Sequence, residues 1–318
     1  MIDALIIYDE KISSKNQCEA LLSELRRNKK INCEYLIIKK NFFHFFPNSL
    51  IFFFLNFFYF PNKIKKKNYK FILSCGRTSA PYNLFFSKRK YTQSYHILDP
   101  YFRRNFFKNI IVPHHDKKKF QNYKNIFFTT GSLTKQIKSQ QKNHKNKKEI
   151  ISILIGGSGK SSKFKIQDID SCVKIMNNFK SKYYVNYCFS RRTPKEIKKY
   201  IISNKYKLHN HYPRRNLNPY EDLLETSDYF VITEDSVGMI SDALSTGKSV
   251  YVIKIKSLKR KLKSFSEFLI NKKYVRVFDG KLEKFSYKPL NETKRVANLI
   301  LQNITNDYEP KSTDLDTF

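Results

Sequence analysis

Three short segments in the second half of the chain gather residue types that bind phosphate, each where a strand is expected to end. The first, Gly156-Gly157-Ser158-Gly159-Lys160, lies between the apolar run 150–155 and a predicted helix. Glycines let the backbone approach a phosphate, N–H groups of the turn hold the anion, and Lys160 adds a positive charge. A Walker NTPase needs a further glycine at position 154, where this chain has leucine. We therefore predict a simpler phosphate-binding turn, with an ordinary tight turn as the alternative.

The second segment, Ser190-Arg191-Arg192-Thr193-Pro194, also joins a predicted strand to a helix. Two arginines at the start of a helix oppose the helix dipole, which favours negative charge there. An anion bound between them would resolve this conflict, so we predict a second contribution to phosphate binding. Two solvated arginines in a basic protein are the alternative.

The third segment, Thr233-Glu234-Asp235-Ser236, follows an apolar strand and precedes a helix. Ser236 can cap that helix and contact a phosphate, and Glu234 or Asp235 can accept hydrogen bonds from ribose or sugar hydroxyls. Ordinary acidic capping explains one of these residues but not all three together. We therefore predict a nucleotide or sugar contact here.

The first half of the chain carries two further segments of this kind. Gly76-Arg77-Thr78 follows a predicted strand and offers an arginine and a hydroxyl. His114, His115 and Asp116 follow another strand, and a histidine beside an aspartate can act as a general base. Exposed loop histidines without a catalytic role are the more common case. No third ligand indicates a metal, and we expect neither a metal nor a cofactor.

The elements that must position these segments are strands that alternate with helices, a pattern typical of β-α-β units and parallel sheets. Strands are predicted at 5–8, 34–38, 70–74, 94–98, 109–112, 126–129, 150–155, 183–189, 229–233 and 249–253, and the clearest helices at 17–25, 165–179, 194–202, 237–245 and 291–303.

A polar linker, 138–149, divides the chain into two predicted domains, 1–137 and 150–305, and 306–318 is a predicted flexible tail. The fold class is therefore α/β, with two Rossmann-like parallel-sheet domains facing a cleft. In such sheets ligands bind beyond the carboxyl ends of the strands.

The formal charge of +34, from 61 basic and 27 acidic side chains, has two interpretations. It can attract nucleic acid, anionic lipid or a phosphorylated substrate. It can also reflect an A/T-rich genome, because Lys, Asn, Ile, Phe and Tyr are abundant together and the lysines are dispersed. No zinc-finger, RNP or basic-zipper pattern is present, so we predict no specific nucleic-acid partner.

The five cysteines form no CxxC pair and are odd in number, which indicates free thiols in a reducing compartment. The first residues read as a strand and lack the basic region of a signal peptide. We therefore predict a cytoplasmic protein, with peripheral association at the inner membrane face.

The membrane prediction rests on segment 42–60, which is mostly apolar and about as long as a membrane span. Pro47, Asn48 and Asn56 interrupt it, and lysines flank both ends, so a true span is not expected. An aromatic segment between basic flanks suits the interface of an anionic leaflet. A buried helix of the first domain is the alternative.

Taken in order, the segments resemble those of the "elongated mitochondria" family, which comprises plant mitochondrial fission factors and bacterial homologues. The resemblance covers residues 1–300 and rests on the motifs Asn16-Gln17-Cys18, Gly76-Arg77-Thr78, Pro113-His114-His115-Asp116, Ile155-Gly156-Gly157-Ser158, Ser190-Arg191-Arg192-Thr193-Pro194, Asn218-Pro219-Tyr220, Thr233-Glu234-Asp235-Ser236-Val237 and Thr246-Gly247-Lys248. This chain departs from the pattern in its Phe- and Lys-rich connecting segments and in a glycine loop richer in glycine and lysine.

The resemblance implies a glycosyltransferase-B-like fold, similar to that of the transferase that adds N-acetylglucosamine to the lipid-linked peptidoglycan precursor. It implies no settled activity, because the plant members act as adaptors that recruit a dynamin-related protein. An epimerase that uses a dinucleotide needs glycines after the first strand, where this chain has Asp9-Glu10-Lys11, so that activity is not predicted.

Two functions follow as hypotheses. The first is transfer of a sugar from a nucleotide-sugar to an envelope or lipid-linked acceptor at the inner membrane face, without a metal. The second domain would bind the donor through Gly156, Gly157, Ser158, Lys160, Ser190, Arg191, Arg192, Thr193, Glu234, Asp235 and Ser236. The first domain would bind the acceptor near Gly76, Arg77 and Thr78, with His114, His115 or Asp116 as base. The second hypothesis is a non-enzymatic membrane adaptor.

Overall fold

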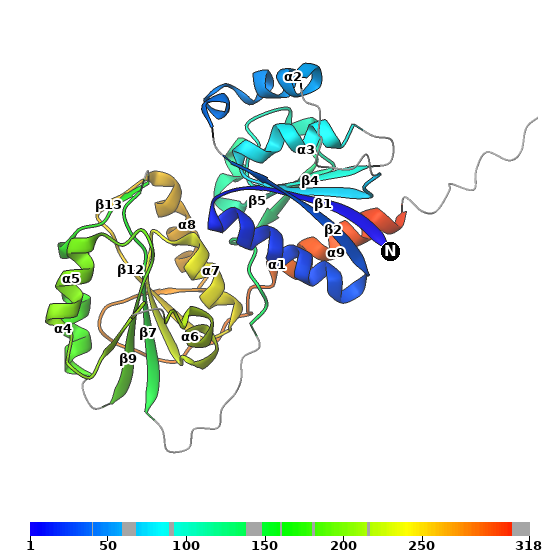
Figure 1. Cartoon of the computed structure of the whole chain (residues 1–318). Coiled ribbons are helices and arrows are strands. Elements are labelled where there is room, and N and C mark those ends of the chain that lie inside the picture. The colour runs from blue at the N-terminus through cyan, green and yellow to red at the C-terminus, as the bar shows by residue number, and fades with distance from the viewer. Residues whose placement is uncertain are drawn as a thin grey trace, which may run out of the picture. The chain divides into compact units, whose positions relative to one another are not determined.

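The chain divides into two compact units, each described here by itself (Figure 1). The computed structural model describes residues 1–39, 41–58, 68–88, 92–137, 148–159, 161–179, 182–214 and 217–306. Unit 1 comprises Met1–Lys135 and Asn291–Phe318, and unit 2 comprises Gln136–Leu290. Each unit contains a six-stranded parallel sheet flanked by helices, which confirms the α/β prediction. Most of the predicted linker and tail lies outside the described residues.

Unit 1 has the strand order β2-β1-β3-β4-β5-β6. Its strands are β1 (Ile2–Asp9), β2 (Ile31–Ile38), β3 (Phe71–Cys75), β4 (Gln93–Ile97), β5 (Asn109–Pro113) and β6 (Ile126–Thr129). Its helices are α1 (Ile12–Asn28), α2 (Asn48–Phe58), α3 (Ala80–Phe86) and α9 (Glu292–Asn306), with 3₁₀ helices η1 (Phe42–Phe45), η2 (Arg77–Ser79), η3 (Arg104–Phe106) and η4 (His114–Lys119).

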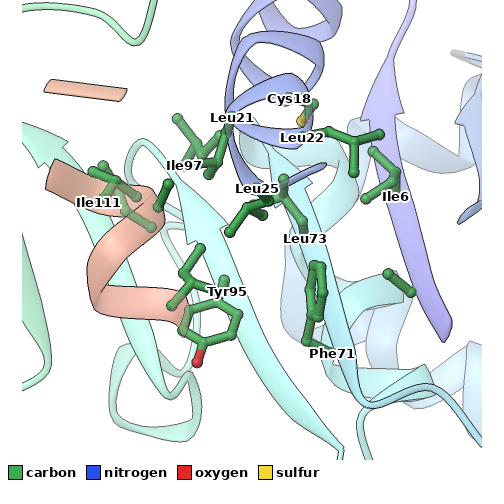
Figure 2. Packing of buried hydrophobic residues seen from close by; sticks show 14 of the residues in the cluster. Ile6, Cys18, Leu21, Leu22, Leu25, Phe71, Leu73, Tyr95, Ile97 and Ile111 are labelled. Carbon is green, nitrogen blue, oxygen red and sulfur yellow. The ribbon is translucent and has the colours of Figure 1, made fainter. Parts of the chain in front are cut away.

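The two faces of the unit 1 sheet bury alternate residues of each strand, as the period of an extended chain requires. Ile6 of β1 packs toward α1 and α9, in the core that Figure 2 shows around Leu21 and Leu25. Leu5 and Ile7 belong to the core that contains residues of α2 and α3. Helices therefore cover both faces, and the strand ends are left to carry loops.

The last helix packs on unit 1, whereas the sequence placed it in the second domain. Val296, Ala297 and Ile300 of α9 are fully buried among residues of α1, β1 and β3. The Thr293 hydroxyl also accepts a hydrogen bond from the Thr134 N–H at 2.9 Å. The predicted boundary at residue 305 is therefore wrong, because an amphipathic helix at the end of a chain fits either sheet and its sequence does not say which.

Segment 42–60 forms η1 and α2, although residues 59 and 60 lie outside the described part. Ile51, Phe52 and Leu55 of α2 are buried against unit 1, while Phe53 and Phe57 are exposed. One face of the helix is thus core and the other is an apolar surface. Among the described residues, no helix is long and apolar enough to cross a membrane.

Unit 2 has the strand order β10-β9-β7-β11-β12-β14. Its strands are β7 (Glu149–Ile155), β9 (Tyr183–Phe189), β10 (Asn210–Tyr212), β11 (Tyr229–Thr233), β12 (Ser249–Ile253) and β14 (Arg276–Val277), with β8 (Ser162–Lys163) and β13 (Ser257–Leu258) in a small antiparallel pair. Its helices are α4 (Asp170–Asn178), α5 (Lys195–Asn204), α6 (Tyr220–Thr226), α7 (Val237–Ser245) and α8 (Arg260–Asn271), preceded by the 3₁₀ helix η5 (Ile166–Asp168).

The helix predicted at 165–179 begins later than expected. Residues 166–168 form η5, and the Asp168 carboxylate accepts hydrogen bonds from the N–H groups of Lys165 and Lys256, at 2.9 and 3.1 Å. The carboxylate thereby ties the start of this segment to the residues after β12, and α4 begins at Asp170.

The strand order of the unit 2 sheet reverses at β7, which makes this a topological switch point. Strands β9 and β10 lie on one side of β7 and β11 and β12 on the other, so the connections leave β7 in opposite directions. The carboxyl ends of strands at such a switch point are where parallel α/β sheets bind ligands.

Candidate functional site

The three segments of unit 2 that were predicted to bind phosphate or a nucleotide, at 156–160, 190–194 and 233–236, meet at this switch point. They do so because they follow the neighbouring strands β7, β9 and β11. The Gly156 N–H donates to the Thr233 hydroxyl at 2.7 Å, and the Gly157 N–H donates to Asp235 Oδ2 at 2.9 Å. The Ser190 hydroxyl donates to the Gly156 carbonyl at 2.8 Å. The structure therefore brings together residues that lie far apart in the sequence.

The two glycines make this close approach possible. A Cβ on Gly156 would lie 2.3 Å from Asp235 Oδ1, and a Cβ on Gly157 would lie 2.1 Å from the Arg192 carbonyl oxygen. The space that a side chain would fill is thus occupied by the other two loops. The sequence explained these glycines by the approach of a phosphate, but their direct role in the structure is to let three loops touch.

Asp235 is the buried charge at the centre of this contact. The residue is only 4% exposed, and among the described residues its Oδ1 atom has no hydrogen-bond partner. Burial raises the pKa of Asp235, whereas the Gly157 N–H, the Thr233 side chain and the Arg192 guanidinium act to lower that pKa. Arg192 Nη2 lies 3.5 Å from Asp235 Oδ2, and the Arg192 side chain is 50% exposed. A guanidinium is therefore held at the surface by a buried carboxylate.

The start of α7 adds N–H donors beside this guanidinium. Ser236 precedes the helix, but its side chain makes no capping hydrogen bond to the first turn. Backbone N–H groups at such a terminus favour an anion. Arg191 is exposed on the neighbouring loop, and Thr193 is buried with its hydroxyl donating to the Ile155 carbonyl at 3.0 Å. The arrangement offers two arginines and a helix terminus at one sheet edge.

Other predicted donor residues have structural partners. Glu234 is buried, and its two oxygens accept hydrogen bonds at 2.7 Å, one from Lys254 Nζ and one from the Ile255 N–H. The Ser158 hydroxyl accepts a hydrogen bond from the Phe164 N–H at 3.1 Å. A sugar contact to Glu234 would have to compete with these bonds. Lys160 lies outside the described residues.

The predicted residues of unit 1 lie at the carboxyl edge of its own sheet. Gly76 has a φ of +87°, which suits glycine, and Arg77 is exposed while Thr78 is buried. His115 Nε2 lies 3.9 Å from Asp116 Oδ2, but the His115 side chain is only 3% exposed. A base at His115 would need to become accessible first. In the described part of the chain, no three His, Cys, Asp or Glu side chains gather as a metal site.

Two side-chain interactions of unit 2 were not predicted from the sequence. Lys254 follows β12 just as Glu234 follows β11, so strand pairing would have indicated their contact. Asp242 of α7 accepts a hydrogen bond from the Tyr220 hydroxyl at 2.8 Å, and burial raises the pKa of Asp242 from 3.8 to about 6. Tyr220 belongs to the motif Asn218-Pro219-Tyr220, which carried part of the family resemblance but no predicted partner.

The raised pKa of Asp242 predicts a pH-dependent loss of stability. Between about pH 4 and pH 6 the folded chain keeps a proton that the unfolded chain releases, so the free energy of unfolding falls as pH rises through this window. At ~1.4 kcal/mol per pKa unit the loss is about 3 kcal/mol. Asp242→Asn can still accept the Tyr220 hydrogen bond but cannot ionise. We expect this variant to match the wild type near pH 4 and to exceed its stability at pH 7.

Urea unfolding of both proteins from pH 4 to pH 7 measures this difference. Asp222→Asn is a suitable control because Asp222 is exposed on α6. Parallel stability profiles for the wild type and Asp242→Asn would contradict the assignment.

Comparison with known families agrees with the sequence motifs. A sequence profile of the family described as "Mitochondrial fission ELM1" matches residues 14–304. The chain belongs to this family. An uncharacterized protein, RP120, of Rickettsia prowazekii is 28% identical over 93% of this chain and 96% of its own length. The mitochondrial fission protein ELM1 of Arabidopsis thaliana is 44% identical over a shorter stretch, 26% of this chain and 20% of the plant protein.

Solved structures place this ELM1 family member among glycosyltransferase-B folds. The UDP complex of MnaA from S. aureus has a TM-score of 0.59 at 11% identity and covers 99% of this chain and 100% of its own. UDP-GlcNAc 2-epimerase from Neisseria meningitidis, bound to UDP-GlcNAc, has a TM-score of 0.50 at 14% identity, with 96% and 100% covered. The glycosyltransferase SnogD from Streptomyces nogalater has a TM-score of 0.50 at 10% identity, with 98% and 97% covered. The predicted fold is confirmed, and because epimerases and transferases share it, the fold does not choose between them.

Proposed function

We propose that the chain binds a nucleotide-sugar in unit 2 and acts as a glycosyltransferase-like protein on an envelope or lipid-linked acceptor at the cytoplasmic membrane face. The observation that carries the proposal is the junction of the three loops at the switch point of the unit 2 sheet. Gly157, Arg192 and Asp235 make direct contacts there, next to the start of α7, which the Ser236 side chain does not cap. The structures of MnaA and of the Neisseria epimerase hold UDP and UDP-GlcNAc on the same fold.

The donor's diphosphate is expected to interact with Arg191, Arg192 and the first N–H groups of α7. The Gly156 and Gly157 N–H groups already have acceptors within the protein, so they hold the loops rather than the phosphate. A diphosphate beside Arg192 would accept hydrogen bonds from the guanidinium that now interacts with Asp235. Arginines and a helix terminus can stabilise a departing diphosphate without a metal.

A panel of UDP-, GDP-, CMP- and ADP-sugars tests this proposal by thermal stabilisation. A ligand at a hundred times its dissociation constant adds about 2.7 kcal/mol to the folded state. We expect a shift of the melting temperature with one nucleotide class and loss of that shift in Arg192→Ala. Arg276→Ala is the matched control, since Arg276 is also half-exposed and paired with a carboxylate in unit 2. A shift that persists unchanged in Arg192→Ala would place the ligand elsewhere.

The second candidate function is a non-enzymatic membrane adaptor, and the exposed aromatic face of η1 and α2 favours it. Four phenylalanines of unit 1 are exposed and lie outside its buried core: Phe42, Phe45, Phe53 and Phe57. An adaptor needs such a surface but no nucleotide site. Folded protein that binds anionic vesicles yet shows no shift with any nucleotide-sugar would support the adaptor and reject the transferase.

A further inference from the structure

Unit 1 contains a groove at the carboxyl ends of β3 and β4. None of the residues proposed to bind the nucleotide-sugar donor belongs to it. It has a volume of about 570 Å³ and is lined by Pro47, Asn48, Ser49, Arg77, Tyr101 and Phe102. A smaller hollow of about 240 Å³ continues from it, because Tyr101 and Phe102 line both and Arg103 lines the second. The larger volume lies within the range of small-molecule sites.

The walls of the groove are fixed by hydrogen bonds. The Asn48 side-chain amide donates to the carbonyls of Arg77 and Pro100, both at 2.9 Å. Because Asn48 is the first residue of α2, these bonds join the helix to the loops after β3 and β4. Asn48 is itself buried, so the connection is protected from water.

The charge at this groove is positive. Arg77 and Arg103 are both exposed, and among the described residues neither guanidinium has a carboxylate at ion-pair distance. The nearby acid, Asp99, is already taken by Arg104, whose Nε and Nη2 lie 3.0 and 3.1 Å from its two oxygens. Two cations are therefore left for an external anion.

Arg103 is held in place by aromatic rings. Its guanidinium carbon lies 4.8 Å from the centre of the Phe52 ring, 5.5 Å from that of Phe102 and 5.4 Å from that of Phe106. Such cation–π contacts orient the guanidinium but do not neutralise it. Phe52 belongs to α2, so the cation lies next to the apolar helix.

The loop after β4 is strained. Leu98, Tyr101 and Arg103 have φ values of 74°, 55° and 38°, in the left-handed region that non-glycine residues rarely adopt. Residues held in this region store backbone strain, and they cluster at ligand sites. The Asp99–Arg104 pair and a hydrogen bond from the Tyr101 N–H to Asp99 Oδ1 at 2.8 Å maintain this conformation.

An apolar surface adjoins the cationic groove. The helix that starts at the groove with Asn48 exposes Phe53 and Phe57, whose rings lie 4.5 Å apart. Figure 1 shows α2 at the periphery of unit 1, on the side of α3. A ligand that contacts both the cationic groove and the exposed phenylalanines would carry an anionic group next to an apolar chain.

We propose that this groove binds the phosphate-bearing head of an amphiphile, with Arg77 and Arg103 on the phosphate and the apolar chain along the aromatic side chains of α2. The amphiphile is the acceptor of the proposed transfer, and that role, though not the binding itself, rests on the proposed function.

Calorimetric titration of the full chain with farnesyl phosphate, farnesol and inorganic phosphate tests the site. Farnesyl phosphate is expected to bind roughly tenfold or more tightly than either farnesol or inorganic phosphate, since only it uses both features. Arg77→Ala and Arg103→Ala are each expected to weaken it by roughly tenfold. Lys29→Ala, a matched loss of charge at the C-terminal end of α1, is expected to leave binding unchanged.

Each other outcome overturns the proposal. Equal binding of inorganic phosphate would indicate a free-anion site, and equal binding of farnesol would indicate an apolar surface alone. Unchanged binding by Arg77→Ala and Arg103→Ala variants that keep the wild-type melting temperature would move the site elsewhere. The nucleotide-sugar panel is a separate readout on unit 2, so its failure beside positive farnesyl phosphate binding would reject the transferase and retain this groove.

Discussion

Gly157→Ala is expected to destabilise unit 2 by about 3 kcal/mol and to abolish stabilisation by a nucleotide-sugar. The added Cβ would lie 2.1 Å from the Arg192 carbonyl oxygen, 2.2 Å from its carbon and 2.5 Å from the Thr193 nitrogen. All three are backbone atoms, so no side-chain rotation relieves the overlap. The loop at 190–193 would have to move, and the hydrogen bond from Ser190 to Gly156 would be strained with it.

Gly238→Ala is the matched control for this variant. Gly238 lies on α7 in the same unit, and a Cβ there would meet nothing within 4 Å. Alanine in a helix is favoured over glycine by up to about 1 kcal/mol, so this variant is expected to be at least as stable as the wild type. Urea unfolding of both variants measures the effect on stability, and the nucleotide-sugar panel with Gly157→Ala and the wild type measures the effect on binding. A Gly157→Ala protein of wild-type stability would show that the loop contact is not required.

The sequence predicted the three loops of the candidate site because the relevant signals are local. Apolar strands 150–155, 183–189 and 229–233 each end in an unusual set of polar residues, and parallel strands end at a common edge. The common edge therefore followed from the parallel arrangement, and the structure adds that the three strands are neighbours. The role of the glycines did not, because it depends on which loop atoms fill the space beside each Cα.

Features that depend on distant partners escaped prediction. Glu234 resembles an exposed acid at a strand end, yet Lys254 and the Ile255 N–H bind it from the end of β12. The loop after β4 contains three left-handed residues and no glycine, so its composition does not indicate which residues adopt that conformation. The last helix carries an apolar stripe that fits either sheet, and only packing assigns it to unit 1.

Vesicle binding is expected to depend on the exposed phenylalanines of η1 and α2. Phe42 and Phe45 are 79% and 83% exposed, and Phe53 is also exposed, so none of the three stabilises the core. Burying a phenylalanine away from water contributes about 1.5–3 kcal/mol, and partial burial at a membrane interface contributes less. Replacing all three by serine is therefore expected to weaken partitioning into anionic vesicles by about a hundredfold or more.

Co-sedimentation with vesicles of phosphatidylcholine, with and without phosphatidylglycerol, measures this partitioning. The control replaces three exposed apolar residues of unit 2, Tyr184, Ile202 and Leu208, by serine, which removes similar surface from the other unit. Lysines beside an apolar surface add attraction to anionic lipid, so wild-type binding should also fall with salt and with loss of phosphatidylglycerol. If the triple phenylalanine variant bound as the wild type does, the aromatic surface would have to serve another partner. Loss of binding in that variant alone would instead assign membrane contact to η1 and α2, between which Pro47 lines the groove of unit 1.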